Sequence, residues 1–226
     1  MKTVTVLACA LLAGCGGNSA QAPSQPASEP AAASPPQPAA DDRPVVVAFG
    51  DSLTAGFGAD PGRSYPDFLQ KDIDAAGLRW RVVNAGVSGD TTSDGLARLG
   101  EVLTYKPRIV IVEFGGNDGL RGLPVATTRA NLEKIVTGIR ETGARVVLAG
   151  MTLPPNYGPG YIRSFEEIYK SLAAKYKLPL IPFLLTDVAM HPKLMQPDGI
   201  HPTGAGNRIV ARNVMQVLEP LLRSSQ

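Results

Sequence analysis

The sequence predicts an α/β domain of three layers, in which a parallel sheet of about five strands lies between two layers of helices. Two observations lead to this fold class. Five short apolar runs recur between residues 45 and 226, and longer segments with apolar residues at helical spacing separate them. Strands joined by helices of this length pair in parallel through right-handed crossovers.

The first expected strand is residues 45–50. Its apolar residues 45–49 are typical of a strand covered on both faces, and Gly50 then allows a sharp turn. Ser52 follows just beyond the carboxyl end of this strand, which is the edge where open α/β sheets bind ligands. A serine at this place can be a nucleophile if a base reaches it.

The remaining elements follow from the same patterns. Ser64 can cap a helix that has Asp67 in its first turn and Gly77 at its end. Thr203 can cap the last helix of the chain. The other expected strands are 80–85, 108–114, 145–149 and a short one within 178–183, and the other expected helices are 93–103, 125–141 and 161–176.

Composition argues against several classes of function. The formal charge is only +2, and no run of Lys or Arg suggests a nucleic-acid partner. Both cysteines, Cys9 and Cys15, lie in the first fifteen residues, and the only histidines are His191 and His201. We therefore expect no disulfide, no cysteine metal site and no multi-histidine metal cluster in the folded domain.

The N-terminal segment predicts export and a lipid anchor. Residues 1–14 have the pattern of a signal peptide, whose apolar run 4–12 is too short to span a membrane. The segment Leu12-Ala13-Gly14-Cys15 resembles a bacterial lipobox, in which cleavage leaves Cys15 as a lipidated N-terminus. The alternative is plain secretion with an incidental cysteine.

The next segment predicts a tether. Residues 16–44 are rich in Ala, Pro, Ser and Gln and cannot bury enough apolar surface to fold. We therefore expect residues 15–44 to tether a single domain, residues 45–226, to a membrane of the bacterial envelope. Gly16 rather than Asp follows the cysteine. By resemblance to lipoprotein sorting in Gram-negative bacteria, this favours the outer membrane, facing the periplasm.

Polar clusters at 84–92, 115–119 and 198–203 can converge with Ser52 on one rim, because each lies at a strand end or a helix start. Acyl transfer by a serine needs a base, a carboxylate that orients it, and oxyanion donors. Asp198 lies three residues before His201 across a glycine-containing turn, so its carboxylate can reach the imidazole Nδ1–H. His191, with Asp187 four residues earlier, is the alternative base, although a structural role is favoured for it.

The residues alone do not decide which groups donate to the oxyanion. Asn117 is either a turn former after two glycines or a donor through its amide. Gly86 is either a turn glycine or a donor through its backbone N–H. Each of these positions, taken singly, favours the structural alternative.

Taken together, four segments resemble the conserved blocks of the SGNH (GDSL) hydrolase superfamily, in the family's order. They are Gly50-Asp51-Ser52-Leu53, Gly86 after Asn84-Ala85, Gly115-Gly116-Asn117-Asp118 and Asp198-Gly199-Ile200-His201-Pro202. Segments 51–58, 88–92 and 153–158 look like those of the bacterial branch of multifunctional thioesterases, arylesterases and lysophospholipases. The resemblance covers residues 45–222.

The resemblance implies a flavodoxin-like sheet of strand order 2-1-3-4-5, without a metal or a cofactor. It implies Ser52 as nucleophile, His201 as base and then acid, and Asp198 as the carboxylate that orients the base. The N–H groups of Ser52 and Gly86 and the side chain of Asn117 would form the oxyanion hole.

The substrate rim is expected in the loop 151–160, where Leu153 and Tyr157 would line the acyl site. Thr152 departs from the family pattern, because related enzymes often carry Arg there. The resemblance therefore supports ester hydrolysis by this protein more strongly than it supports a preference for thioesters.

We expect a monomeric serine esterase that cleaves short to medium acyl esters, aryl esters, lysophospholipids and acyl thioesters through an acyl-serine intermediate. Two alternatives were considered, a carbohydrate O-deacetylase of the cell envelope and a non-catalytic lipid- or glycan-binding lipoprotein. The match to the thioesterase-like branch argues against the first, and the complete set of catalytic candidates argues against the second.

Overall fold

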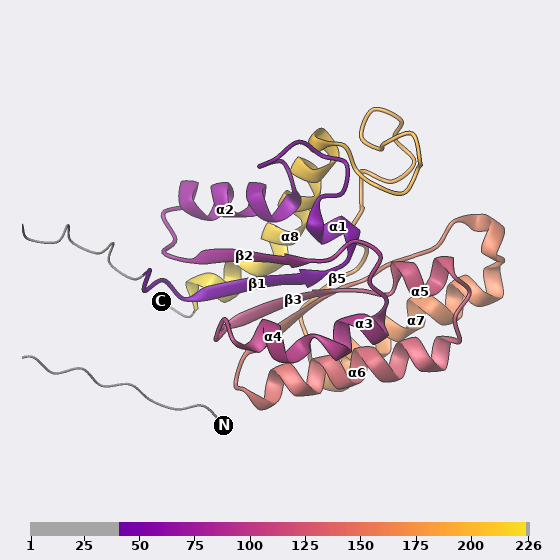
Figure 1. The fold of residues 1–226 in the computed structure, drawn as a ribbon, viewed down its shortest axis with the longest axis horizontal. Helices are drawn as coiled ribbons and strands as arrows, with labels where there is room; N and C mark the ends of the chain where they lie inside the picture. Colours follow the sequence, from indigo (N-terminus) through magenta and orange to yellow (C-terminus); the bar gives the residue numbers. More distant parts are fainter. Residues whose placement is uncertain (1–40, 225–226) are drawn as a thin grey trace, which may run out of the picture. The chain divides into compact units, whose positions relative to one another are not determined.

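The computed structural model describes residues 41–224 (Figure 1). The expected signal peptide, Cys15 and all but the last four residues of the expected tether lie outside the described residues. Those four residues already contact the folded domain. The Arg43 guanidinium donates to the carbonyl of Trp80, and Asp42 forms an ion pair of 3.1 Å with Arg79.

A single parallel sheet forms the centre of the domain, and its strand order is β2-β1-β3-β4-β5. This confirms the expected order. The strands are β1 (Val45–Gly50), β2 (Arg81–Gly86), β3 (Ile109–Glu113), β4 (Arg145–Ala149) and β5 (Leu180–Ile181). Every residue of β1 and of β3 is buried, which explains why these strands are apolar without alternation.

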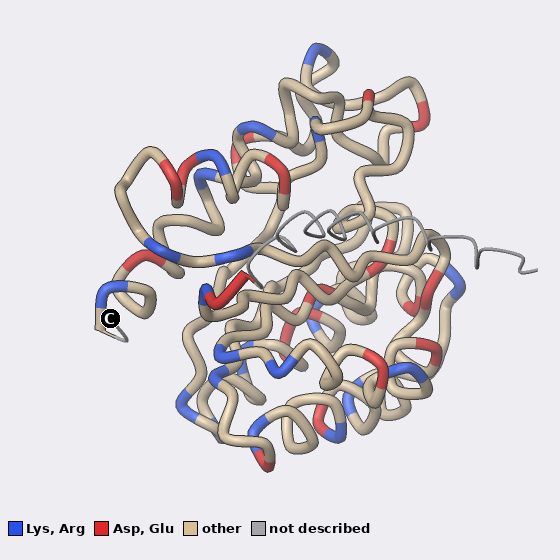
Figure 2. The backbone as a smooth tube through the Cα atoms, turned by 60° about the vertical axis from the view of Figure 1, so that its left-hand side comes forward, with Lys and Arg blue, Asp and Glu red and all other residues tan. Residues whose placement is uncertain are grey.

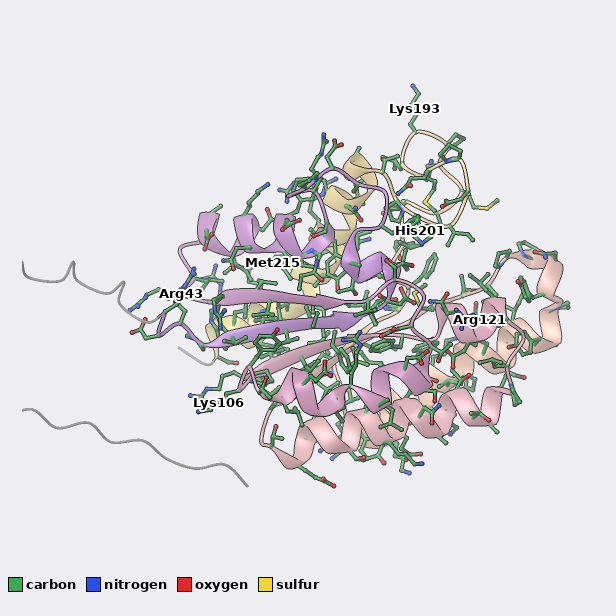
Figure 3. All side chains as sticks on the ribbon, in the orientation of Figure 1. Arg43, Lys106, Arg121, Lys193, His201 and Met215 are labelled. Atoms are coloured by element: carbon green, nitrogen blue, oxygen red, sulfur yellow. The ribbon has the colours of Figure 1, made fainter. Side chains whose placement is uncertain are left out.

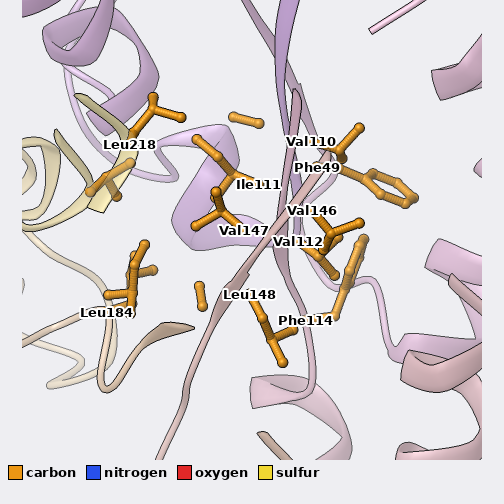
Figure 4. Packing of buried hydrophobic residues seen from close by; sticks show 14 of the residues in the cluster. Phe49, Val110, Ile111, Val112, Phe114, Val146, Val147, Leu148, Leu184 and Leu218 are labelled. Carbon is orange, nitrogen blue, oxygen red and sulfur yellow. The ribbon is translucent and has the colours of Figure 1, made fainter. Parts of the chain in front are cut away.

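Helices cover both faces of this sheet, with α2 and α8 on one face and α3, α4, α6 and α7 on the other (Figure 1). Their bounds are α2 (Tyr65–Ala75), α3 (Thr92–Ala97), α4 (Leu99–Leu103), α6 (Val125–Glu141), α7 (Pro159–Tyr176) and α8 (Gly204–Arg223). Ser64 and Thr203 cap α2 and α8 as expected. Figure 4 shows Val110 and Val112 on one side of β3, and Ile111 on the side of Leu218 from α8.

Two expected elements differ in the structure. The helix expected at 93–103 is broken into α3 and α4 at Arg98, which has φ −100° and ψ 11° and turns its guanidinium inward to strand carbonyls. The short strand expected within residues 178–183 is present and extends over only two residues. Pro179 and Pro182 flank it, and neither has an N–H to donate to the ladder.

Three short elements at the carboxyl edge of the sheet were not expected. They are α1 (Ser52–Ala55), α5 (Gly116–Leu120) and the 3₁₀ turn η1 (Pro155–Tyr157). Segments of three to five residues are too short to show a helical period, so a sequence pattern cannot reveal them. They nevertheless surround the expected site.

Charged residues of both signs are distributed over the helices and loops of the domain (Figure 2), in keeping with the small net charge. Within residues 41–224, no helix is long and apolar enough to cross a membrane. In the same part of the chain, no group of three or more His, Cys, Asp or Glu side chains is arranged to hold a metal ion.

Candidate active site

A serine, a histidine and an aspartate form a continuous hydrogen-bonded chain at the carboxyl edge of the sheet. Ser52 is the first residue of α1, directly after β1, whereas His201 comes from the loop between β5 and α8. The His201 Nε2 atom lies 2.8 Å from Ser52 Oγ, and its Nδ1 atom lies 2.7 Å from Asp198 Oδ2. Figure 3 shows His201 beside the ends of the strand arrows.

The aspartate of this chain is fixed by its own turn. Asp198 Oδ1 accepts hydrogen bonds from the N–H groups of Ile200 (2.9 Å) and His201 (3.0 Å). Partial desolvation raises the pKa of Asp198, but the hydrogen bonds from the backbone and ring of His201 outweigh it and bring the pKa to about 2. The carboxylate is therefore charged at neutral pH and holds the His201 ring by Nδ1–H.

The other histidine lies apart from the serine. His191 is exposed, its N–H donates to the carbonyl of Val188, and its own carbonyl accepts from the N–H groups of Leu194 and Met195. The histidine within hydrogen-bond distance of Ser52 is His201. The geometry thus favours the first of the two bases that the sequence left open.

The two expected oxyanion donors other than Ser52 already have acceptors. Asn117 Nδ2 donates to the carbonyl of Asp90 (2.9 Å) and to Asp51 Oδ2 (3.2 Å). The Gly86 N–H donates to Asn84 Oδ1 at 2.9 Å. Sequence reasoning did not anticipate these bonds, because each is set by the turn that places the residue.

Gly86 is required by packing rather than by a turn conformation. A Cβ atom at this position would lie 2.7 Å from the carbonyl carbon of Thr54 in α1, a distance that no ordinary contact reaches. The missing side chain lets α1 lie directly against the end of β2. The backbone of Gly86 therefore lies close to Thr54 and Ala55, the last two residues of α1.

A buried carboxyl pair beneath the serine was missed by the sequence analysis. Glu113 is fully buried at the end of β3, and its Oε2 accepts from the Asp51 N–H (3.2 Å) and from Thr54 Oγ1 (2.8 Å). Burial raises the pKa of Glu113 well above its usual range, and burial also raises the pKa of Asp51 to about 6. The sequence signal that could have revealed this pair is Glu113 itself, a single acidic residue at the end of an apolar strand.

Arg98 also escaped the sequence analysis, although it joins three parts of the site. Its guanidinium donates to the carbonyls of Gly50 and Ala85, both at 2.9 Å, and pairs with Asp90 at 2.6 Å. The same group lies 4.7 Å from the ring centroid of Phe49. Arg98 thus ties the ends of β1 and β2 to the loop whose Asp90 carbonyl holds Asn117.

The expected substrate rim packs against α5. Leu153 is only 6% exposed and contacts Gly119, so its side chain faces inward rather than lining an open rim. The hydroxyl of Tyr157, which is partly buried, donates to the carbonyl of Leu120 at 2.7 Å. Thr152, in the same loop, donates through Oγ1 to Glu166 Oε1 at 2.5 Å.

Known proteins are similar to this chain in sequence and in fold. A model of the GDSL-like Lipase/Acylhydrolase family matches residues 48–209. Esterase TesA of Pseudomonas aeruginosa is 45% identical over 179 residues, which are 79% of this chain and 89% of the relative. The Escherichia coli protein named thioesterase 1/protease 1/lysophospholipase L1 is 39% identical over 179 residues, 79% of this chain and 85% of the relative.

A crystal structure of TesA superposes with a TM-score of 0.76 at 44% identity and covers 78% of this chain and 99% of that chain. The segments that carry Ser52, Gly86, Asn117, Asp198 and His201 all lie within residues 48–209, which the family model matches. The chain belongs to the GDSL-like lipase/acylhydrolase family and is an SGNH-type hydrolase.

Proposed function

We propose that the chain is a serine esterase whose catalytic triad is Ser52, His201 and Asp198. The observation that carries this proposal is the unbroken chain from Ser52 Oγ through the imidazole to Asp198 Oδ2. His201 takes the Ser52 proton as the hydroxyl attacks the ester carbonyl, and then gives that proton to the leaving alcohol. Water then attacks the acyl-serine and gives a proton to His201. His201 returns that proton to Ser52 Oγ as the carboxylic acid is released.

The developing oxyanion is held by the N–H groups of Ser52 and Gly86 and by the side chain of Asn117. Ser52 is in the first turn of α1, where N–H groups have no acceptor within the helix. The Asn117 bond to Asp51 is the longer of its two, at 3.2 Å against 2.9 Å, so the oxyanion replaces Asp51 as acceptor. The Gly86 N–H is shared between Asn84 and the substrate.

The substrates are acyl esters of short to medium chain length, aryl esters, lysophospholipids and acyl thioesters. Relatives are named esterase, thioesterase and lysophospholipase, which supports this range. Phe57, Val87 and Ile200 are between 39% and 51% exposed and adjoin the segments that carry the triad and Gly86. They offer apolar surface to the substrate, while Leu153 and Tyr157 support the rim from below through α5.

The location is proposed from the N-terminal segment. Residues 1–14 direct export, Cys15 carries the lipid, and residues 15–44 tether the monomeric domain to the outer membrane. A lysophospholipid in that membrane is then within reach of the tethered enzyme, whereas cytosolic acyl thioesters are not.

Three variants test the proposed triad on the purified domain. We expect Ser52→Ala and His201→Ala to lower kcat on p-nitrophenyl octanoate by at least about 10⁴-fold. His191→Ala is the matched control and should stay within about twofold of wild type, because His191 is exposed and lies apart from Ser52. Full activity of Ser52→Ala would refute the proposed nucleophile.

A substrate panel tests the class of ester. We expect turnover of p-nitrophenyl octanoate and lysophosphatidylcholine, and little release of acetate from acetylated xylan. Preferential deacetylation of the xylan would instead make the protein a carbohydrate O-deacetylase.

A further inference from the structure

The loop that carries the base has little regular structure of its own. Residues 182–203 join β5 to α8, and their one strand-type contact in the described chain is an isolated bridge between Met195 and Pro202. Ser52, by contrast, lies in a helix that follows β1, a strand paired on both sides, with β2 and β3. The two reacting side chains are 149 residues apart in sequence, so other contacts must hold the loop against the serine.

Gln196 makes such contacts in both directions. Its side-chain Nε2 donates to the carbonyl of Phe57 at 2.7 Å and to the carbonyl of Pro202 at 2.9 Å. Its backbone N–H donates to the carbonyl of His201 at 2.7 Å. The Nε2 assignment follows from the partners, because only the NH₂ end of the amide can donate to two carbonyls.

The partner on the serine side is one hydrogen bond away from the nucleophile. The Phe57 N–H donates to the Ser52 carbonyl at 3.0 Å, so Gln196 is connected to both Ser52 and His201 through backbone groups. The Phe57 ring also lies against the His201 ring, with 4.6 Å between the centroids. A Cβ at Gly58 would come within 2.9 Å of Gln196 Nε2, so the glycine allows this close approach.

We propose that Gln196 is a positioning residue that locks the turn of His201 onto the turn of Ser52. The inference rests on the proposed triad. It concerns only the distance between the two turns, since Asp198 holds the His201 ring through bonds within its own turn. Without the side-chain amide, His201 keeps its aspartate but loses its alignment with Ser52 Oγ.

The test is Gln196→Met, which keeps the length of the side chain and removes both donors. A misplacement of about 1 Å can cost about 10²-fold in rate, so we expect kcat per folded molecule to fall about 10- to 100-fold on p-nitrophenyl octanoate. KM should change by less than about threefold. The acid-side midpoint of the pH profile should not move, because the contact between His201 and Asp198 is intact.

Gln70→Met is the matched control. Gln70 also bridges backbone groups, since its Oε1 accepts from the Val82 N–H at 2.7 Å and its Nε2 donates to the Trp80 carbonyl at 3.1 Å. Its side chain joins α2 to β2, and its hydrogen bonds go to Asp74, the Trp80 carbonyl and the Val82 N–H rather than to the loop of residues 182–203. This variant should lose stability as Gln196→Met does, and keep kcat per folded molecule.

Two results would overturn the proposal. One is a Gln196→Met variant with wild-type kcat per folded molecule. The other is a pH midpoint that moves together with kcat, which would mean that Gln196 acts on the contact between His201 and Asp198. Should Gln196→Met not fold, Gln196→Leu decides by the same criteria, because it also removes both donors and adds no charge near His201. Ser52→Ala in the same assay distinguishes a wrong role for Gln196 from a wrong triad. If the proposed triad were wrong, Ser52→Ala would remain active.

Discussion

Replacing Asn117 with alanine should affect catalysis and stability by separable amounts. The side chain donates two hydrogen bonds, to the Asp90 carbonyl and to Asp51 Oδ2. Their loss leaves both acceptors without this donor in a site where Asp51 is nearly fully buried. Such a loss costs about 1–3 kcal/mol in the free energy of unfolding.

The catalytic cost is larger and has a different origin. An oxyanion donor acts in the transition state rather than in substrate binding, so its removal lowers kcat and leaves KM nearly unchanged. Loss of one such donor costs about 10²–10³-fold in kcat. We therefore expect Asn117→Ala to lose this factor for each folded molecule, beyond any loss of folded protein.

The assay measures kcat on p-nitrophenyl octanoate at a temperature where urea titrations show the variant to be folded. Gln70→Ala is the control, because the Gln70 amide also donates to a backbone carbonyl, that of Trp80 at 3.1 Å just before the start of β2, away from the site. A fluorophosphonate should label Ser52 in Asn117→Ala more slowly than in wild type, since the reagent uses the same oxyanion hole. Unchanged kcat per folded Asn117→Ala molecule, with reduced stability, would refute the oxyanion role.

Three further predictions concern other parts of the chain. Because burial raises the pKa of Asp51 from 3.8 to about 6, its protonated form stabilises the fold at low pH, and this contribution is lost as pH rises through about 6. Asp51→Asn should flatten that decline in urea titrations at pH 4 and pH 7, and an identical slope would contradict the assignment. Leu153→Ala should cost about 2–5 kcal/mol in unfolding free energy, since the side chain is buried against Gly119. The same variant should lower the activity on octanoate esters more than the activity on acetate esters. Equal losses of activity on both esters would leave only the packing role. Cys15→Ser should abolish incorporation of a fatty-acid analogue in a Gram-negative host, and an unlabelled wild type would remove the anchor.

Much of the fold was accessible from the sequence because its signals are local. Buried parallel strands need unbroken apolar runs, and helices between them need apolar residues at helical spacing, so β1, α6 and β4 could be placed within a residue or two of their ends. The candidate triad was accessible for a different reason. With two histidines in the chain, few residues could serve as a base, and the turn from Asp198 to His201 is itself a local structure.

The tertiary structure decided everything that depends on which distant residues meet. It separated His201 from His191, broke a continuous helical pattern at Arg98, and turned Leu153 inward against α5. It also placed Glu113 under the serine and Gln196 between the turn of Ser52 and the turn of His201. The contacts of Leu153 with Gly119, of Glu113 with Asp51, of Gln196 with Phe57 and of His201 with Ser52 join residues that lie between 34 and 149 positions apart. The periodicity of one segment shows only which of its faces is buried. Which distant residue a side chain contacts depends on the order of the strands and on the paths of the loops, because these bring both residues to the same edge of the sheet.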